Sequence, residues 1–552
     1  MSQQVPLLIA GGTLVSKDHD RQPGEVLVDG ERIAIVAPRI PARQGWKLID
    51  AAGKVVAPGF MNIHSHADFH LPIPEHAQLY ERLLWQGITT NVGGQCGFCF
   101  FPLRRERRKE LADYQGFLLY RDIEAEWVDC RQYFDFLKGR MLFNYAQLVG
   151  HGTLRVNAAG FSERISREQM QDMTRLLEES LDAGCFGLSS GLMYMPGTFA
   201  ATEELVALAR VAKRHPNAFY ASHLRGYSAT FLEAVKEIIQ VGREVGLPIQ
   251  VSHLGPFGVK NGYKIQKAIE LMEKARQEGI DVAYDSLGYC GSDTLAIALF
   301  PPSAYSRGLD RFLEDIRDDS FWNALIGRLR AYVPQWPSWE GNGWTDNFVE
   351  CCGIENIYVL GSRDPSFVGK SFVSLAEDWH LDAWEALRRV VLAERADFKI
   401  FIDGIGGELY ASPEQPSFDA MIEHPLCINS VDEVFDRSGR SWLEAWGSFP
   451  HIVRRYVKER KTLELKTVVE RFTSRIAERL GIGDRGYLRQ GCFADIVVLD
   501  LNEYSDHPAL FAQAPRCATG VEQLLINGEP VIENGKLNQV LPGQLIRNLR
   551  AK

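Results

Sequence analysis

The stretch that decides the fold runs from residue 58 to residue 66 and reads Pro-Gly-Phe-Met-Asn-Ile-His-Ser-His. Residues i and i+2 of a β-strand project from the same side, about 7 Å apart along the backbone. His64 and His66 are therefore expected to point together from the end of an apolar strand. Two imidazoles in this arrangement can hold a metal ion, although a bare His-x-His motif fits a locally hydrogen-bonded pair equally well.

A pattern of an apolar strand, polar residues and a helical stretch begins here and repeats to about residue 440. The expected strands are residues 55–63, 89–93, 147–149, 185–188, 219–221, 249–251, 281–284 and 426–430. Helical stretches lie between them, such as residues 167–183, for which Ser166 is the expected N-cap. Eight strands alternating with helices predict an α/β fold, the (β/α)8 barrel. The run at residues 398–401 is a surplus strand that this count does not place.

Residues 1–57 and 481–552 differ from this pattern, because both consist of short strands separated by turns. The strands expected there are residues 7–9, 25–28, 33–36, 47–49, 55–56, 486–488, 494–499 and 523–528. Small isolated sets of strands are only marginally stable, so we expect the two ends to form one small β-sandwich. The barrel then occupies residues 58–480, with an insertion around residues 303–400.

The composition excludes several classes of protein. The chain of 552 residues is 45% hydrophobic, with a net charge of -10, which argues against a nucleic-acid partner. The apolar run at residues 6–10 is too short for a signal peptide, and no stretch approaches the roughly 18 apolar residues of a membrane span. The 10 cysteines lack the spacing of a disulfide framework, so we predict a cytoplasmic protein. We expect it to bind a small-molecule substrate.

Metal-type side chains follow several of the expected strands, and the active site of such a barrel lies at the carboxyl ends of its strands. They are His64, His66, Cys96, His223, His253 and Asp432. Any one of them fits a packing role, but their recurrence at one rim favours a site. A thiolate with two imidazoles is a normal zinc set that leaves a coordination position open. Cys96 and Cys99 also form a Cys-x-x-Cys motif, but no second pair lies nearby, so we take Cys96 as a ligand and Cys99 as a packing residue.

Longer motifs connect the chain to a known family. They are residues 58–66, 87–97, 150–155 (Gly-His-Gly-Thr-Leu-Arg), 187–197 (Gly-Leu-Ser-Ser-Gly-Leu-Met-Tyr-Met-Pro-Gly), 222–225 and 490–495. Together they closely resemble the D-aminoacylase, or N-acyl-D-amino-acid deacylase, family of the amidohydrolase superfamily. The resemblance covers nearly the whole chain.

This resemblance implies a metal-dependent barrel hydrolase with a split β-sandwich. It implies one tightly bound zinc ion held mainly by Cys96, His223 and His253, and a second, weaker site at His64 and His66. It also implies a catalytic Asp on the last strand, for which Asp403 and Asp432 compete. The family's Asp follows His-Pro and precedes Gly-Thr-Phe-Pro-Arg. Only Asp432 lies between His424-Pro425 and a similar segment, Gly-Ser-Phe-Pro-His at residues 447–451, so Asp432 is our choice.

The residues expected to bind substrate depart from the family pattern. Tyr194 and Tyr289 match the family's substrate-contacting tyrosines. The family's carboxylate-binding Lys is replaced by Gly255, and Asp293 stands where small hydroxyl residues are usual.

Two cations could supply the missing charge, and one further residue could face the substrate. The cations are Lys260 and Arg225. His151 ends the third strand, where contact with the substrate and a packing role fit equally well.

The expected reaction is hydrolysis of the amide in an N-acyl-D-amino acid or a close analogue. A bound divalent cation supplies an activated water, and Asp432 acts as general base and then general acid. His64, His66 or Tyr194 polarises the carbonyl oxygen. Two alternatives stay open: a cyclic-amide hydrolase like hydantoinase or dihydroorotase, and a non-catalytic barrel that serves as a binding module.

Overall fold

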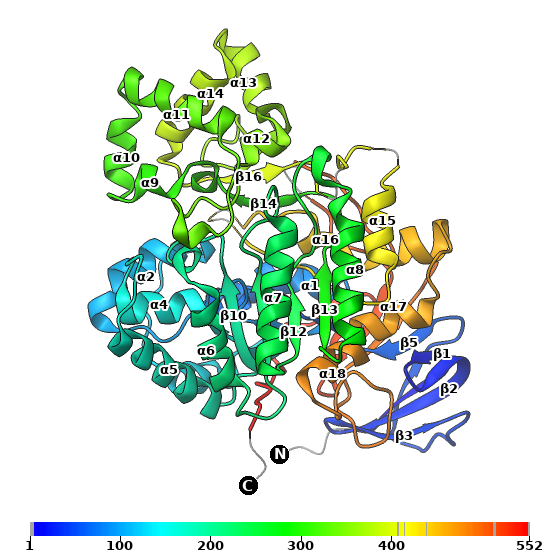
Figure 1. The fold of residues 1–552 in the computed structure, drawn as a ribbon. Coiled ribbons are helices and arrows are strands. Elements are labelled where there is room, and N and C mark those ends of the chain that lie inside the picture. Colours follow the sequence, from blue (N-terminus) through cyan, green and yellow to red (C-terminus); the bar gives the residue numbers. More distant parts are fainter. Residues whose placement is uncertain are drawn as a thin grey trace.

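The computed structural model describes residues 5–405, 408–412, 414–435, 437, 439–511 and 515–549. A barrel of parallel strands surrounded by helices lies at the centre (Figure 1). A β-sheet layer that contains β1, β2 and β3 lies below one side of it, and a lobe of helices, α9 to α14, stands above it (Figure 1).

The eight strand positions of the barrel follow one another in sequence order, and all of their strand pairs are parallel. They are β6 (Phe60–Asn62), β7 (Ile88–Gly93), β8 (Asn144–Gln147) continued by β9 (Val149–Gly150), β10 (Gly187–Gly191), β11 (Phe219–His223), β12 (Ile249–Val251), β13 (Val282–Ser286) and β17 (Cys427–Asn429). At the seam between β6 and β17, the Asn62 side chain accepts a hydrogen bond from the Val431 N–H at 3.0 Å. The expected (β/α)8 barrel is confirmed.

Helices cover the outside of the barrel (Figure 1). They are α1 (His76–Leu84), α2 (Arg108–Gln115), α3 (Cys130–Leu137), α4 (His151–Ala159), α5 (Arg167–Asp182), α6 (Thr202–Ala212), α7 (Phe231–Val245), α8 (Lys264–Gln277), α15 (Pro416–Glu423), α16 (Glu444–Ile452), α17 (Leu465–Phe472) and α18 (Ser474–Leu480). Helix α5 begins as expected, because the Ser166 hydroxyl accepts from the Gln169 N–H and the Gln169 side chain caps the Ser166 N–H. None of the helices in the described ranges combines the length and apolarity needed to cross a membrane.

Strands from both ends of the chain join in one nine-stranded sheet, as expected for a β-sandwich domain built from the two termini. They are β1 (Leu7–Ser16), β2 (His19–Asp29), β3 (Arg32–Ala37), β4 (Lys47–Asp50), β5 (Val55–Pro58), β18 (Ile496–Leu499), β19 (Val521–Ile526), β20 (Glu529–Glu533) and β21 (Lys536–Leu537). Strand β5 connects the two ends, since it pairs in parallel with β1 and antiparallel with β18.

Two expected strands differ from the structure. Residues 55–63 are two strands, because the chain leaves the terminal sheet at Pro58 and enters the barrel at Phe60. Gly59 fits this junction: a Cβ there would lie 2.4 Å from the Thr89 side chain, and the Gly59 N–H bonds to the Asp495 carbonyl at 2.8 Å. Residues 486–488 form no strand.

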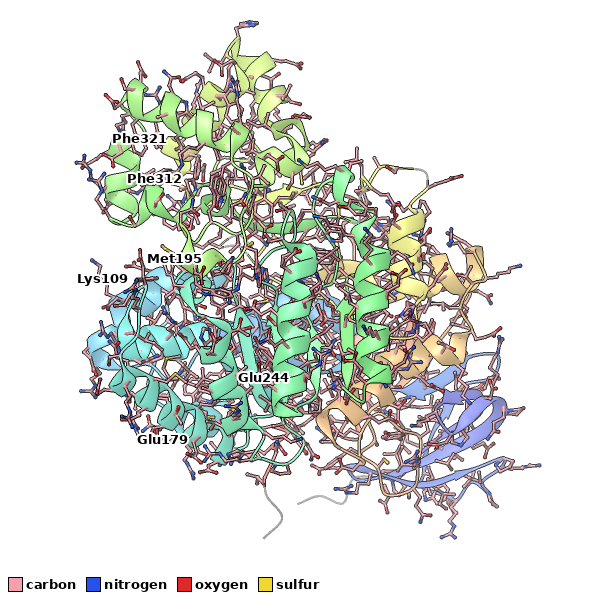
Figure 2. The ribbon with its side chains drawn as sticks, viewed as in Figure 1. Lys109, Glu179, Met195, Glu244, Phe312 and Phe321 are labelled. Carbon is pink, nitrogen blue, oxygen red and sulfur yellow. The ribbon has the colours of Figure 1, made fainter. Side chains whose placement is uncertain are left out.

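The segment between β13 and α15 carries the surplus strand. It holds a three-stranded sheet of β14 (Ser292–Leu295), β15 (Ile357–Gly361) and β16 (Lys399–Ile402), in which β16 pairs antiparallel with both others. Its helices are α9 (Pro302–Tyr305), α10 (Leu309–Asp315), α11 (Asp319–Ala331), α12 (Phe348–Cys352), α13 (Phe372–Trp379) and α14 (Ala383–Glu394). Figure 2 labels Met195 where this lobe meets the barrel, and Phe312 within the lobe.

Candidate metal centre and substrate cavity

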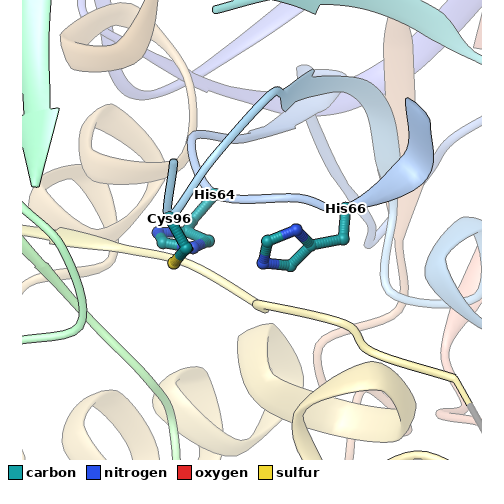
Figure 3. A group of neighbouring side chains, drawn as sticks. All are labelled: His64, His66 and Cys96. Atoms are coloured by element: carbon teal, nitrogen blue, oxygen red, sulfur yellow. The ribbon is translucent and has the colours of Figure 1, made fainter. Parts of the chain in front are cut away.

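Parallel strands bring their carboxyl ends to one rim of the barrel, and the expected ligands meet there. His64 and His66 follow β6, and Cys96 follows β7 (Figure 3). His223 is the last residue of β11, and His253 lies two residues past β12. Asp432 follows β17, and its N–H donates to the His64 carbonyl at 3.1 Å.

The thiol and the imidazoles lie in direct contact. Cys96 Sγ is 3.2 Å from His64 Nε2 and 3.5 Å from His253 Nε2. His223 Nδ1 is 3.0 Å from His253 Nε2. Three groups, each with ligand atoms within 4.8 Å of one another, can be drawn in this cluster: His64 with His66 and Cys96, Cys96 with His223 and His253, and His64 with His253 and Asp432.

The Asp432 carboxylate connects the two halves of the cluster. Its Oδ1 lies 3.3 Å from Nε2 of both His64 and His66, and its Oδ2 lies 4.0 Å from His253 Nε2. The carboxylate is therefore placed to contact a metal ion, or a water bound to one, from the open side of the cluster.

The donor set fits a transition-metal ion such as zinc. Zinc prefers sulfur and imidazole ligands, and imidazole nitrogens that lie close together can share one cation. His223 Nε2 and His66 Nδ1 are buried without a hydrogen-bond partner in the described part of the chain. Cys96 and Asp432 also hold left-handed backbone angles, with φ of 52° and 50°, a strain that is concentrated at functional sites.

Electrostatics support the same interpretation. Burial disfavours the Cys96 thiolate, but the nearby charge of His64 and hydrogen bonds from the other imidazoles lower the pKa of Cys96 well below its usual range. Burial lowers the pKa of His66, while Asp432 and Cys96 raise it to about 10. Burial raises the pKa of Asp432, yet the imidazoles outweigh burial and hold that pKa well below the usual range. The shifts of both Cys96 and Asp432 therefore favour the anionic forms of these side chains.

Asp285 and Tyr227 orient the cluster, and the sequence analysis missed both. Asp285 Oδ1 lies 3.5 Å from His64 Nδ1 and accepts the His253 N–H at 2.9 Å. The Tyr227 hydroxyl is 3.0 Å from His253 Nδ1. Asp285 lies in β13, one residue beyond the expected end of that strand, so the strand-end criterion that found His223 also applies to it.

A cavity opens beside the cluster and is lined by His66, Cys96, His223, His253 and Asp432. Most of its remaining wall is apolar, including Phe98, Phe117, Leu254, Phe257, Leu295 and Ile405. Tyr194 lines the cavity, with its ring centroid 4.8 Å from that of His223. Burial raises the pKa of Tyr194 well above its usual range, so its hydroxyl remains a proton donor.

Known proteins are similar to this chain in sequence and in fold. The model of the amidohydrolase family matches residues 47–298 and 397–532. The chain belongs to the amidohydrolase family. The N-acyl-D-glutamate deacylase of Alcaligenes xylosoxydans xylosoxydans is 29% identical over 551 residues, covering 99% of this chain and 97% of that protein. The D-aminoacylase of the same organism is 28% identical and covers 96% of this chain and 95% of that protein.

A solved amidohydrolase structure agrees with the fold described above. It is the N-acyl-D-glutamate deacylase from Bordetella bronchiseptica, complexed with zinc and a phosphonate inhibitor that mimics the tetrahedral intermediate. The TM-score is 0.78 at 26% identity, and the match covers 99% of this chain and 100% of that one. Residues 299–396, which the family model does not match, contain the segment of α9 to α14.

Two residues expected to bind substrate lie away from the cavity of this amidohydrolase. Arg225 is buried, and its guanidinium is paired with Glu237 at 2.9 Å and bonded to the Thr198 and Ala200 carbonyls. His151 Nε2 bonds to Glu204 at 2.8 Å. Neither lines the cavity, because carboxylates on helices hold both side chains elsewhere, and a substrate contact for either residue stays a prediction.

Tyr289 reaches the cavity with its ring, but its hydroxyl is already engaged. The hydroxyl donates to Asp506 Oδ2 at 2.9 Å, and the ring lies 4.2 Å from the ring of His451. The ring is therefore available to a substrate as an apolar surface.

The two candidate aspartates have different surroundings. Asp403 lies beyond β16, and its Oδ1 accepts the N–H groups of Gly404 at 2.9 Å and Tyr410 at 2.7 Å. It shapes its own loop and does not line the cavity. Asp432 is the one that joins the metal-type cluster, and its catalytic role stays a prediction.

Proposed function

We propose that this amidohydrolase removes the acyl group from N-acyl-D-amino acids, using zinc. The observation that carries the proposal is that a cluster of Cys, imidazole and Asp side chains lines a largely apolar cavity. The near full-length similarity to an N-acyl-D-glutamate deacylase and a D-aminoacylase supports the same reaction.

The ligands of a tightly held ion would be Cys96, His223 and His253, with His64 and His66 beside a second, weaker one. The close approach of Cys96 to His64, at 3.2 Å, supports a shared thiolate between the two positions. Zinc bound there supplies a water that ionises near neutral pH.

Asp432 is the proposed general base and general acid. Its carboxylate faces both halves of the cluster, so it can take a proton from a water held there and deliver it to the leaving nitrogen. The Tyr194 hydroxyl is the proposed donor to the carbonyl oxygen, since it lines the cavity beside His223 and stays protonated.

The cavity wall indicates which groups the substrate carries near the amide. Phenylalanine, leucine and isoleucine side chains dominate it, so an apolar acyl group or an apolar D-side chain gains most from burial there. We therefore expect N-acyl derivatives of D-leucine, D-methionine or D-phenylalanine to be better substrates than those of D-glutamate or D-aspartate.

A substrate panel tests the proposal. Zinc-loaded protein is incubated with N-acetyl and N-formyl derivatives of apolar and acidic D-amino acids, their L-enantiomers, and hydantoin and dihydroorotate as cyclic amides. The expected result is release of the acyl group from D-substrates alone. Turnover of the cyclic amides without any D-substrate would replace the proposal. A protein that takes up no zinc when zinc is supplied, and turns over none of the compounds, would support a binding module.

A further inference from the structure

The cavity holds a buried cation that the sequence analysis did not identify. Lys399, the first residue of β16, is the one Lys or Arg side chain among the described residues that line it. It is 4% exposed. A buried ammonium is costly unless a partner compensates for its lost hydration, so its position in an apolar wall requires an explanation.

Two neighbours bind the ammonium group of Lys399 and leave one of its N–H groups free to donate. Its Nζ donates to the Val434 carbonyl at 2.6 Å and forms an ion pair with Asp293. Asp293 lies on β14, where Leu295 is directly opposite Lys399, so the pair is a diagonal cross-strand contact on one face of the sheet. An ammonium has three N–H donors, and these two partners occupy two of them.

The other cations proposed from the sequence cannot take this role. Arg225 is held by Glu237, and Lys260 is exposed and paired with Glu350 outside the cavity. A side chain at residue 255 is also blocked, because a Cβ on Gly255 would lie 2.6 Å from the Ile405 side chain.

Ile405, which blocks a side chain at residue 255, and the buried Lys399 belong to the same segment. Ile405 follows β16, and a backbone hydrogen bond of 2.8 Å from the Gly258 N–H to the Gly404 carbonyl fixes this segment against the loop after β12. Strand β16 therefore closes the position beside the β12 loop and at the same time brings its own lysine into the cavity.

We infer that Lys399 binds the α-carboxylate of the substrate, with Asp293 and the Val434 carbonyl holding its ammonium in place. This inference rests on the proposed function for the identity of the substrate. Lys399 acts on binding, since it is not among the residues of the metal-type cluster. The required ligand is an acyl-amino compound with a free carboxylate beside the scissile amide.

The test compares two substrates that differ in one charge, N-acetyl-D-leucine and N-acetyl-D-leucinamide, by release of acetate. For Lys399→Met we expect kcat/KM for the carboxylate substrate to fall about 10- to 100-fold, the scale of a charged hydrogen bond, with most of the change in KM. The value for the amide substrate should stay within about two-fold of that of the unmodified protein. An equal fall for both substrates would show that the lysine is only structural and overturn the inference.

Two further variants keep the test decisive if Lys399→Met folds poorly. The double variant Lys399→Met with Asp293→Asn leaves no unpaired charge and should show the same loss of discrimination. Lys260→Met is the matched control and should discriminate as the unmodified protein does.

Binding separates this inference from the proposed function. Metal-free protein is titrated with N-acetyl-D-leucine in a calorimeter, and we expect Lys399→Met to weaken binding about 10-fold or more while Lys260→Met does not. Binding that depends on Lys399 in a protein that hydrolyses no D-substrate would refute the proposed function and retain the inference. Hydrolysis of D-substrates together with binding that is unchanged in Lys399→Met would retain the proposed function and refute the inference.

Discussion

The two walls of the cavity are built in different ways. The rim that carries the metal-type cluster takes its side chains from the ends of separate barrel strands, β6, β7, β11, β12 and β17. A second part of the wall takes its charged pair, Lys399 and Asp293, from two neighbouring strands of one inserted sheet. On the proposed function, the rim carries out the reaction and the inserted wall binds the substrate carboxylate. Variants of the rim should therefore change metal content and kcat, and variants of the wall should change KM.

The largest effect is expected for Cys96→Ala. The thiolate is the anionic ligand shared by two of the three groups, so its loss should remove most of the bound zinc and, with it, nearly all turnover. Metal content by mass spectrometry checks this. Retention of one tight zinc ion per chain by this variant would show that the site is misplaced.

Cys99→Ala is the matched control for that experiment. Cys99 is also buried near the rim, but its sulfur contacts the backbone of Phe101 at 2.7 Å and of Gly150 at 3.1 Å, away from the cluster. Its removal should lower stability slightly and leave zinc content unchanged.

The next effect in size is expected for Asp432→Asn. The amide keeps the size of the side chain but cannot accept the proton, so kcat should fall about 10²-fold or more with nearly full zinc content. Asp403→Asn should change kcat little, since Asp403 caps its own loop. Steady-state rates on N-acetyl-D-leucine check both, and the reverse pattern would refute the assignment of the general base.

A smaller effect is expected for Asp285→Asn. Asp285 orients His64 and holds the backbone of His253, so zinc affinity should fall about 10- to 100-fold, the range measured for residues that support metal ligands. Competition with a chelator of known affinity measures this change. Asp281→Asn, an exposed carboxylate just before the same strand, should leave the affinity unchanged.

Much of the rim could be predicted from the sequence, for a physical reason. A parallel strand places its final residues at one edge of the barrel, so His64, Cys96 and His253 meet whatever the details of side-chain packing. Asp285 was missed only because the expected strand ended one residue early.

The inserted wall could not be predicted in this way. Residues 398–401 read as a strand, but the sequence did not show that β16 pairs antiparallel with β14 and β15 outside the barrel. The position of Lys399 depends on that pairing. The partners of Arg225 and His151 could not be predicted for a related reason, since Glu237 and Glu204 lie on helices whose packing no local pattern encodes.

The smallest effect is expected at Gly255, where the two walls touch, and it is an effect on stability. Gly255→Ala places a Cβ 2.6 Å from Ile405 Cγ2, so either the loop after β12 or the segment after β16 must shift, at a cost of about 1–3 kcal/mol in the free energy of unfolding. Ile405→Ala removes that methyl group, so the same substitution should cost less in the Ile405→Ala background. Gly483→Ala, with no atom within 4 Å of its Cβ, is the control and should be nearly neutral. Chemical denaturation of the unmodified protein, Gly255→Ala, Ile405→Ala and the double variant measures the coupling free energy between the two positions. Additive costs in the free energy of unfolding would show that the two walls are not in contact.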